Sequence, residues 1–246
     1  MARIEDSKGR LDTNSGYGRL FGNDELGRLI SRVHVCSIRN GLQLEAILWE
    51  TTPYKSTLYG ILGKELPLTQ QGIQVVSGRI IAQYHREVSK SNVDITVSDD
   101  NTEARDRAGK KLPITDLLIL NNSENILHIV ELKDGDVFDT KKADGEIASA
   151  MNFANWIRPQ VNHRVSYYFC AFNQENKQSI VEGIKGRFNI DQVLTGRELC
   201  SLIGVDYDNI RRLRENDQMA NKQYFTRQLL NIPEIRDLIL AQLGIR

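Results

Sequence analysis

Apolar residues recur at helical spacing in the first third of the chain. A helix is predicted to begin at Asn23 or Asp24, because either side chain can cap a first turn. Its apolar positions follow three or four residues apart, at Leu26, Leu29, Ile30 and Val33. We expect a break at Asn40–Gly41, then a second apolar set that runs to Trp49 and is closed by Pro53.

A further helix is predicted from Thr69, with its apolar side formed by Ile73, Val76, Ile80 and Tyr84. From residue 92 the period changes to two, which predicts a strand over 93–97, followed by a polar loop over 98–112. Two apolar runs, 114–120 and 126–133, flank turn-forming residues and therefore predict a β-hairpin.

In the second half of the chain, segments with helical spacing of apolar residues alternate with segments typical of strands. A helix is predicted over 144–157, a central strand over 165–172, and short helices over 177–187 and 196–203. The remainder is expected to be mostly helical, and Pro233 lies in the first turn of a final helix. That helix carries an apolar stripe of Ile235, Leu238, Ile239 and Leu243. We expect the stripe to pack on the core, with a dimer contact as the alternative.

These elements predict an α/β (α+β) protein with a small mixed central β-sheet flanked by helices. We expect a single domain over 1–246. It would have an irregular arm at 1–23, a core at 24–172 and a mostly helical part at 173–246.

Composition narrows the class of protein. Forty per cent of the residues are hydrophobic, which is enough to bury a core, and no apolar run is long enough to span a bilayer. The first residues lack the apolar core of a signal peptide. Cys36, Cys170 and Cys200 are far apart in apolar stretches, so we expect buried free thiols in a reducing cytoplasm. The net charge of zero excludes a uniformly basic surface, although a basic cleft remains possible.

The predicted hairpin carries the residues that suggest a catalytic site. Side chains two apart on a strand share a face, so Glu131 and Lys133 project together, and Asp116 on the neighbouring strand can reach the same edge. Burying a lone Asp116 in an apolar strand costs free energy unless it is paired or bound to metal. Carboxylate oxygens suit Mg²⁺, and a nearby lysine can stabilise charge on a phosphate. The E-x-K triplet alone is common by chance; its combination with Asp116 is the more specific signal.

These residues resemble the PD-(D/E)XK nuclease superfamily, most closely its type II restriction endonucleases. The match is Thr115-Asp116, fifteen residues, then Glu131-Leu132-Lys133, with threonine where the family has proline. The resemblance implies a restriction-endonuclease-like core and Mg²⁺, with Mn²⁺ as a substitute, held by Asp116 and Glu131. It also implies that an N-terminal helix contributes an acid, for which Glu45 is preferred over Glu50.

Several basic residues are candidates for contacts with DNA. Lys110, Lys111, Lys141 and Lys142 flank the hairpin and can meet phosphates, and Arg105 and Arg107 lie in the polar loop, where arginine can contact guanine. The arginine-rich run 211–214 is a further candidate. Each of these sets is equally compatible with a solvated surface.

We therefore expect a Mg²⁺-dependent, sequence-specific endonuclease that acts on double-stranded DNA as a homodimer, since palindromic DNA has two-fold symmetry. The alternatives are a repair or junction-resolving nuclease of the same superfamily and a non-catalytic DNA-binding protein. Other catalytic motifs are absent from the sequence, and His128 is expected to be structural because it lies on the face opposite Glu131.

Overall fold

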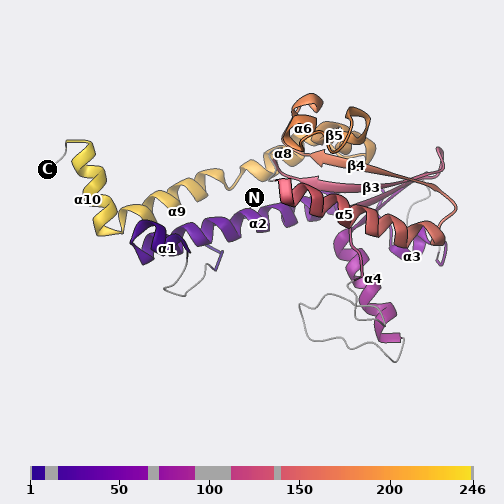
Figure 1. Cartoon of the computed structure of the whole chain (residues 1–246), viewed down its shortest axis with the longest axis horizontal. Helices are drawn as coiled ribbons and strands as arrows, with labels where there is room; N and C mark the ends of the chain where they lie inside the picture. Colours follow the sequence, from indigo (N-terminus) through magenta and orange to yellow (C-terminus); the bar gives the residue numbers. More distant parts are fainter. Residues whose placement is uncertain (1, 9–15, 66–71, 92–111, 136–139, 245–246) are drawn as a thin grey trace. The chain divides into compact units, whose positions relative to one another are not determined.

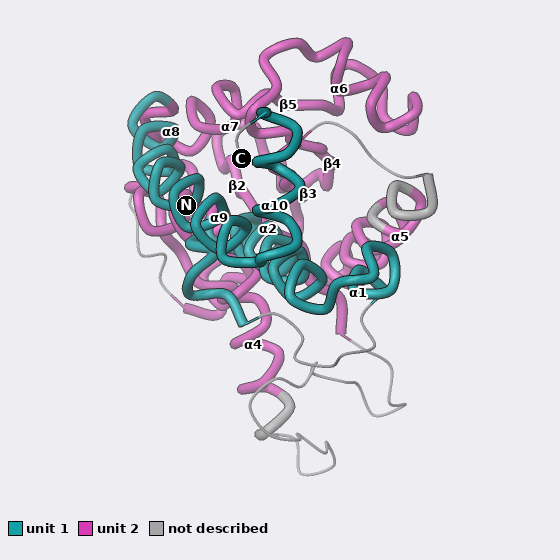
Figure 2. The backbone as a smooth tube through the Cα atoms, turned by 90° about the vertical axis from the view of Figure 1, so that its left-hand side faces the viewer, with its two compact units in different colours: residues 1–43, 208–246 teal, residues 44–207 magenta. Residues whose placement is uncertain are grey.

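The structure, a computed structural model, describes residues 2–8, 16–65, 72–91, 112–135 and 140–244 (Figure 1). These residues form two compact units (Figure 2). Unit 1 comprises residues 1–43 and 208–246, and unit 2 comprises residues 44–207. The helix start expected at Thr69, the strand expected over 93–97 and nearly all of the polar loop fall outside the described residues. Among the described residues, no helix combines the length and the apolar character needed to cross a membrane.

Unit 2 contains a five-stranded mixed sheet with its strands in chain order. The strands are β1 (Ile73–Ser77), β2 (Leu117–Asn121), β3 (Ile126–Lys133), β4 (Arg164–Ala171) and β5 (Val193–Thr195). The first two pairings are antiparallel and the last two are parallel. The predicted fold class, the β2–β3 hairpin and the strand over 165–172 are confirmed.

Helices surround this sheet. They are α3 (Leu58–Ile61), α4 (Gly78–Ser91), α5 (Thr140–Ile157), α6 (Lys177–Gly183) and α7 (Gly196–Leu202). Two short 3-10 helices, at Arg158–Gln160 and Ile190–Gln192, complete the unit. The main core lies between α4, α5 and the sheet, where Ile81 and Phe153 meet Leu118, Leu127 and Ile129. Sheet and helices are therefore held together on one side by fully buried aliphatic and aromatic side chains.

The helix predicted through Ile73 and Val76 is wrong, because strand β1 occupies this segment. These residues form a β-strand that pairs with β2, and the helix begins only at Gly78. Their helical spacing to Ile80 and Tyr84 is coincidental. Ile73, Val75 and Val76 are β-branched, and pairing with a buried neighbouring strand stabilises them more than a helix would.

Unit 1 is helical and is built from both ends of the chain. It contains α1 (Gly16–Phe21), the first part of α2 (Asp24–Thr51), most of α8 (Tyr207–Glu215), α9 (Gln218–Leu230) and α10 (Pro233–Gln242). Its core cluster is small, with Ala2, Ile4, Leu29, Cys36 and Tyr224 as the buried members. The side chain of Asn221 binds the backbone N–H of Ile4 and the carbonyl of Ala2, which attaches the N-terminal residues to α9.

One expectation for the N-terminal region is wrong. The break at Asn40–Gly41 does not occur, because α2 runs without interruption from Asp24 to Thr51. One exposed glycine costs a helix only about 1 kcal/mol, which the buried residues on either side offset. Within the segment expected to be an arm or irregular lead-in, Gly16–Phe21 form the short helix α1.

Candidate active site

The β2–β3 hairpin brings the predicted acidic residues together. Leu117 pairs with Val130, and the same antiparallel register continued by one residue sets Asp116 opposite Glu131. Alternation along β3 places Glu131 and Lys133 on the same face as Leu127 and Ile129, the face that α4 and α5 cover. Asp116, Glu131 and Lys133, called the triad below, therefore lie on one face of the hairpin, where the apolar part of this face ends.

Asp116 is held by the backbone around it. The N–H of Leu132 donates to Asp116 Oδ2 at 2.7 Å, and the N–H of Gly78 donates to the Asp116 carbonyl at 2.8 Å. One residue earlier, the buried hydroxyl of Thr115 donates to the Val130 carbonyl at 3.1 Å. The two residues before β2 are thus held to β3 by the Thr115 hydroxyl and the Asp116 carboxylate, and to the start of α4 by the Asp116 carbonyl.

Glu131 and Lys133 form an ion pair. Glu131 is only 8% exposed, and the ammonium group of Lys133 donates a hydrogen bond to its Oε1. The lysine compensates the charge of a carboxylate that has little access to water. Lys133 is half-buried, so its ammonium group retains access to a ligand at this edge.

Glu45 is the third acid near the hairpin, and it comes from α2. Its Oε1 accepts a hydrogen bond from the backbone N–H of Arg79, at 3.2 Å, in the first turn of α4. Burial raises the pKa of Glu45 to about 7; the Arg79 bond opposes this rise and the charge of Asp116 adds to it. The charge of Asp116 therefore acts on Glu45, which supports the choice of Glu45 over Glu50.

Gly78 makes this arrangement possible. A Cβ atom at this position would lie 2.6 Å from the Thr115 carbonyl oxygen and 3.4 Å from Glu45 Oε1. The first contact is closer than real Cβ atoms tolerate, so glycine is required where α4 begins beside β2. Gly78 and the Thr115 hydroxyl were not predicted as site residues. The position of Gly78 in the sequence, between a β-branched run and a helical pattern, could have indicated a close approach of the backbone there.

The donor set fits a hard divalent cation. Asp116 and Glu131 supply carboxylate oxygens on adjacent strands, and Glu45 and Asp116 repel one another enough to contribute to a raised pKa. A cation such as Mg²⁺ would relieve this repulsion and accept oxygen ligands. Within the described part of the chain, the side chains do not form a ready-made cluster of three His, Cys, Asp or Glu ligands.

The other candidates lie elsewhere or outside the description. Glu50 is exposed and pairs with Lys55 at 3.7 Å. The predicted DNA contacts Arg105, Arg107, Lys110 and Lys111 lie outside the described residues, as do the side chains of Lys141 and Lys142 in α5.

The prediction of buried free cysteines is confirmed, and the structural role expected of His128 stays a prediction. His128 is buried and its Nδ1 bonds to the Ser166 hydroxyl at 2.8 Å. All three cysteines are free and buried, and burial raises the pKa of Cys200 to about 12, which disfavours a nucleophilic thiolate.

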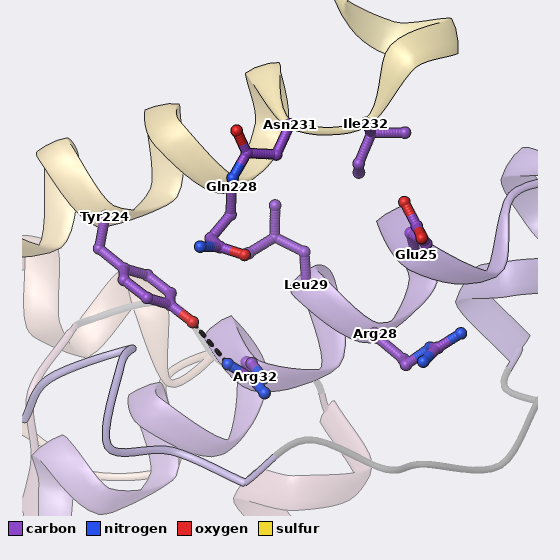
Figure 3. Close-up of a pocket in the computed structure, with 8 residues that line it drawn as sticks. All are labelled: Glu25, Arg28, Leu29, Arg32, Tyr224, Gln228, Asn231 and Ile232. Atoms are coloured by element: carbon purple, nitrogen blue, oxygen red, sulfur yellow. Dashed lines mark hydrogen bonds between the residues drawn. The ribbon is translucent and has the colours of Figure 1, made fainter.

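A separate cavity of about 310 Å³ lies within unit 1, and the triad does not line it (Figure 3). It is lined by Glu25, Arg28, Leu29, Arg32, Tyr224, Gln228, Asn231 and Ile232. Arg32 of α2 donates a hydrogen bond to the hydroxyl of Tyr224 of α9 across the cavity, so these two polar lining groups already bind each other.

Comparison with known proteins gives one informative relative. The chain is 34% identical over 238 residues to the type II restriction enzyme HhaII of Haemophilus parahaemolyticus. The match covers 96% of this chain and 97% of the relative, so it extends over both units. No family model matches the chain, and no solved structure matches it.

Proposed function

The chain belongs to the restriction-enzyme family of HhaII, and we propose that it is a Mg²⁺-dependent endonuclease that cuts double-stranded DNA at a specific sequence. The observation that carries the chemistry is the register of the hairpin, which, continued by one residue beyond Leu117, sets Asp116 opposite Glu131 with Lys133 on the same face. Family membership supports DNA as the substrate, and the two opposed carboxylates beside an ammonium group support phosphodiester hydrolysis.

Each residue of the site has a defined task in this proposal. Asp116 and Glu131 would hold Mg²⁺, and when bound this ion supplies a water of lowered pKa and positive charge beside the phosphate. The Leu132 N–H fixes the orientation of the Asp116 carboxylate. Lys133 has three N–H donors, so on leaving Glu131 it can orient the attacking water and stabilise negative charge on the phosphoryl oxygens.

Glu45 would add a third carboxylate at the edge of the site. Its charge is disfavoured by burial and by Asp116, so it is easily protonated near neutral pH. Bound Mg²⁺ would favour its ionised form.

We further propose that the enzyme acts as a homodimer in the reducing cytoplasm. A palindromic site on duplex DNA presents the same scissile bond twice, and a two-fold dimer provides one active site for each strand. The three free, buried cysteines support a reducing compartment.

The test is to incubate the purified chain with phage DNA and Mg²⁺ and to sequence the fragment ends. Recurrent ends at one short sequence are expected. Cleavage only at branches or other irregular structures would favour a junction-resolving or repair nuclease. Binding without cleavage would favour a non-catalytic DNA-binding protein.

A further inference from the structure

Exposed apolar side chains gather in unit 1. Within the described residues, ten of the twelve exposed large apolar side chains belong to this unit, although it contains only one third of the chain. The buried cluster of the unit is small by comparison. A helical unit with so little buried apolar surface gains little stability from its own core.

Helix α10 shows this most clearly. None of its ten residues is buried, and all ten are described. Its stripe of Ile235, Leu238, Ile239 and Leu243 is partly or fully exposed, with Leu238 at 57% and Leu243 at 66%. The expectation that this stripe packs on the core is therefore wrong for Leu238 and Leu243, while Ile235 and Ile239 are partly buried. A helix of this length is marginal in water without packing of its apolar face.

Helix α1 carries a second exposed set at the same end of the unit. Tyr17, Leu20 and Phe21 are exposed, and Leu20 reaches 72%. The side chain of Asn23 donates a hydrogen bond to Glu234 Oε2 at 2.8 Å, which joins the segment after α1 to the first turn of α10. The two sets together are called the terminal patch. It comprises Tyr17, Leu20, Phe21, Ile235, Leu238, Ile239 and Leu243.

We propose that the terminal patch is the surface on which a second copy of this chain docks, about a two-fold axis. This inference deepens the proposed homodimer and rests on it for the symmetry. In such an interface the same patch faces itself, so its charges must not repel. The exposed charged residues of α1 and α10 meet this condition, since two arginines are balanced by two acids: Arg19, Arg236, Glu234 and Asp237.

The area of the patch also suits a copy of the chain. A stable interface buries roughly 800 Å² on each partner. The patch has seven large apolar side chains, and the most exposed of them, Leu20, is 72% exposed. With roughly 150–200 Å² of surface on each side chain, they supply on the order of half of that area. The polar rim of α1 and α10 is available for the rest.

Sedimentation of the full chain tests the proposal. The wild type should sediment as a dimer at micromolar concentration. Leu238→Glu and Leu20→Glu, on two different helices, should each raise the dissociation constant of the dimer by at least 100-fold. Met151→Glu is the matched control, because Met151 is 54% exposed but lies in unit 2, and it should leave the dimer unchanged.

Circular dichroism of each variant separates loss of the dimer from loss of folding, and a variant that unfolds is replaced by the one on the other helix. A monomeric wild type, or dimers of both Leu238→Glu and Leu20→Glu that are as tight as the wild type, would overturn the proposal. Cleavage of phage DNA is measured on the same samples. A monomer that cuts at one sequence refutes the patch and leaves the nuclease intact, whereas a dimer without cleavage refutes the nuclease and leaves the patch intact.

Discussion

The backbone N–H of Leu132 donates a hydrogen bond of 2.7 Å to the carboxylate of Asp116. This bond links the acid at the start of β2 to the residue between Glu131 and Lys133, the other two members of the triad. The orientation of the carboxylate is therefore fixed by the sheet before any ligand binds. Preorganisation of this kind is what an electrostatic active site requires.

The Thr115 hydroxyl should act as a positioning group for Asp116. Thr115→Val keeps the shape of the side chain but removes the donor to the buried Val130 carbonyl. We expect a loss of about 1–2 kcal/mol in the free energy of unfolding. We also expect a fall in kcat with little change in KM. Thr115→Ser retains the hydroxyl and should restore both values, as measured by urea unfolding and steady-state cleavage. Equal behaviour of the serine and valine variants would refute this role.

Glu45 should make stability depend on pH in the absence of metal. Its pKa rises from 4.5 to about 7 on folding, so the folded state binds a proton more tightly than the unfolded state. The wild type should therefore lose stability as pH rises from about 4.5 to 7. Glu45→Gln cannot ionise, so its free energy of unfolding should not fall over this range. Relative to the wild type, the variant should therefore gain about 3 kcal/mol between pH 4.5 and pH values above 7.

Urea unfolding in EDTA across this pH range measures the effect. Glu50→Gln, at an exposed acid in the same helix, is the control and should follow the wild-type curve. If Glu45→Gln and the wild type differ by the same free energy of unfolding at every pH in this range, the pKa of Glu45 is not raised by folding, and this prediction is refuted.

Metal choice should separate DNA binding from cleavage. Mg²⁺ and Mn²⁺ should both support cleavage, because the proposed ligands are hard oxygen atoms. Ca²⁺ should permit binding without cleavage, since it accepts the same oxygens but acidifies bound water less. In EDTA, the charges of Asp116 and Glu131 would oppose DNA phosphates, which should weaken specific binding. Gel-shift and cleavage assays run in parallel with the four conditions test this, and full cleavage in EDTA would remove the metal role.

The hairpin could be predicted from the sequence because local signals agreed. Two apolar runs flank turn residues, and the period of two along a strand fixes which side chains share a face. The juxtaposition of Asp116 with Glu131 and Lys133 followed from this alone. The structure confirms that arrangement, while the catalytic role of the three residues stays a prediction.

The remaining features depended on long-range packing. Strand β1 was missed because Ile73 and Val76 lie at helical spacing with Ile80, and only pairing with β2 decides between the two structures. The continuity of α2 through Gly41 was missed because a glycine weakens a helix without ending it. The apolar stripe of α10 was visible in the sequence, but whether the core of the same chain covers it depends on the three-dimensional arrangement.

The central claim is that Asp116, Glu131 and Lys133 form the site of phosphodiester hydrolysis. Single-turnover cleavage of cognate DNA by Lys133→Ala tests it most directly, alongside Asp116→Ala and Glu131→Ala and with circular dichroism as the folding control. The matched control is Lys177→Ala, because Lys177 also pairs with a glutamate, Glu198, at 3.1 Å but belongs to α6. We expect each triad variant to fold and to lose on the order of 10²-fold or more in rate, with Lys177→Ala unaffected. A folded Lys133→Ala enzyme with the wild-type rate would contradict the account.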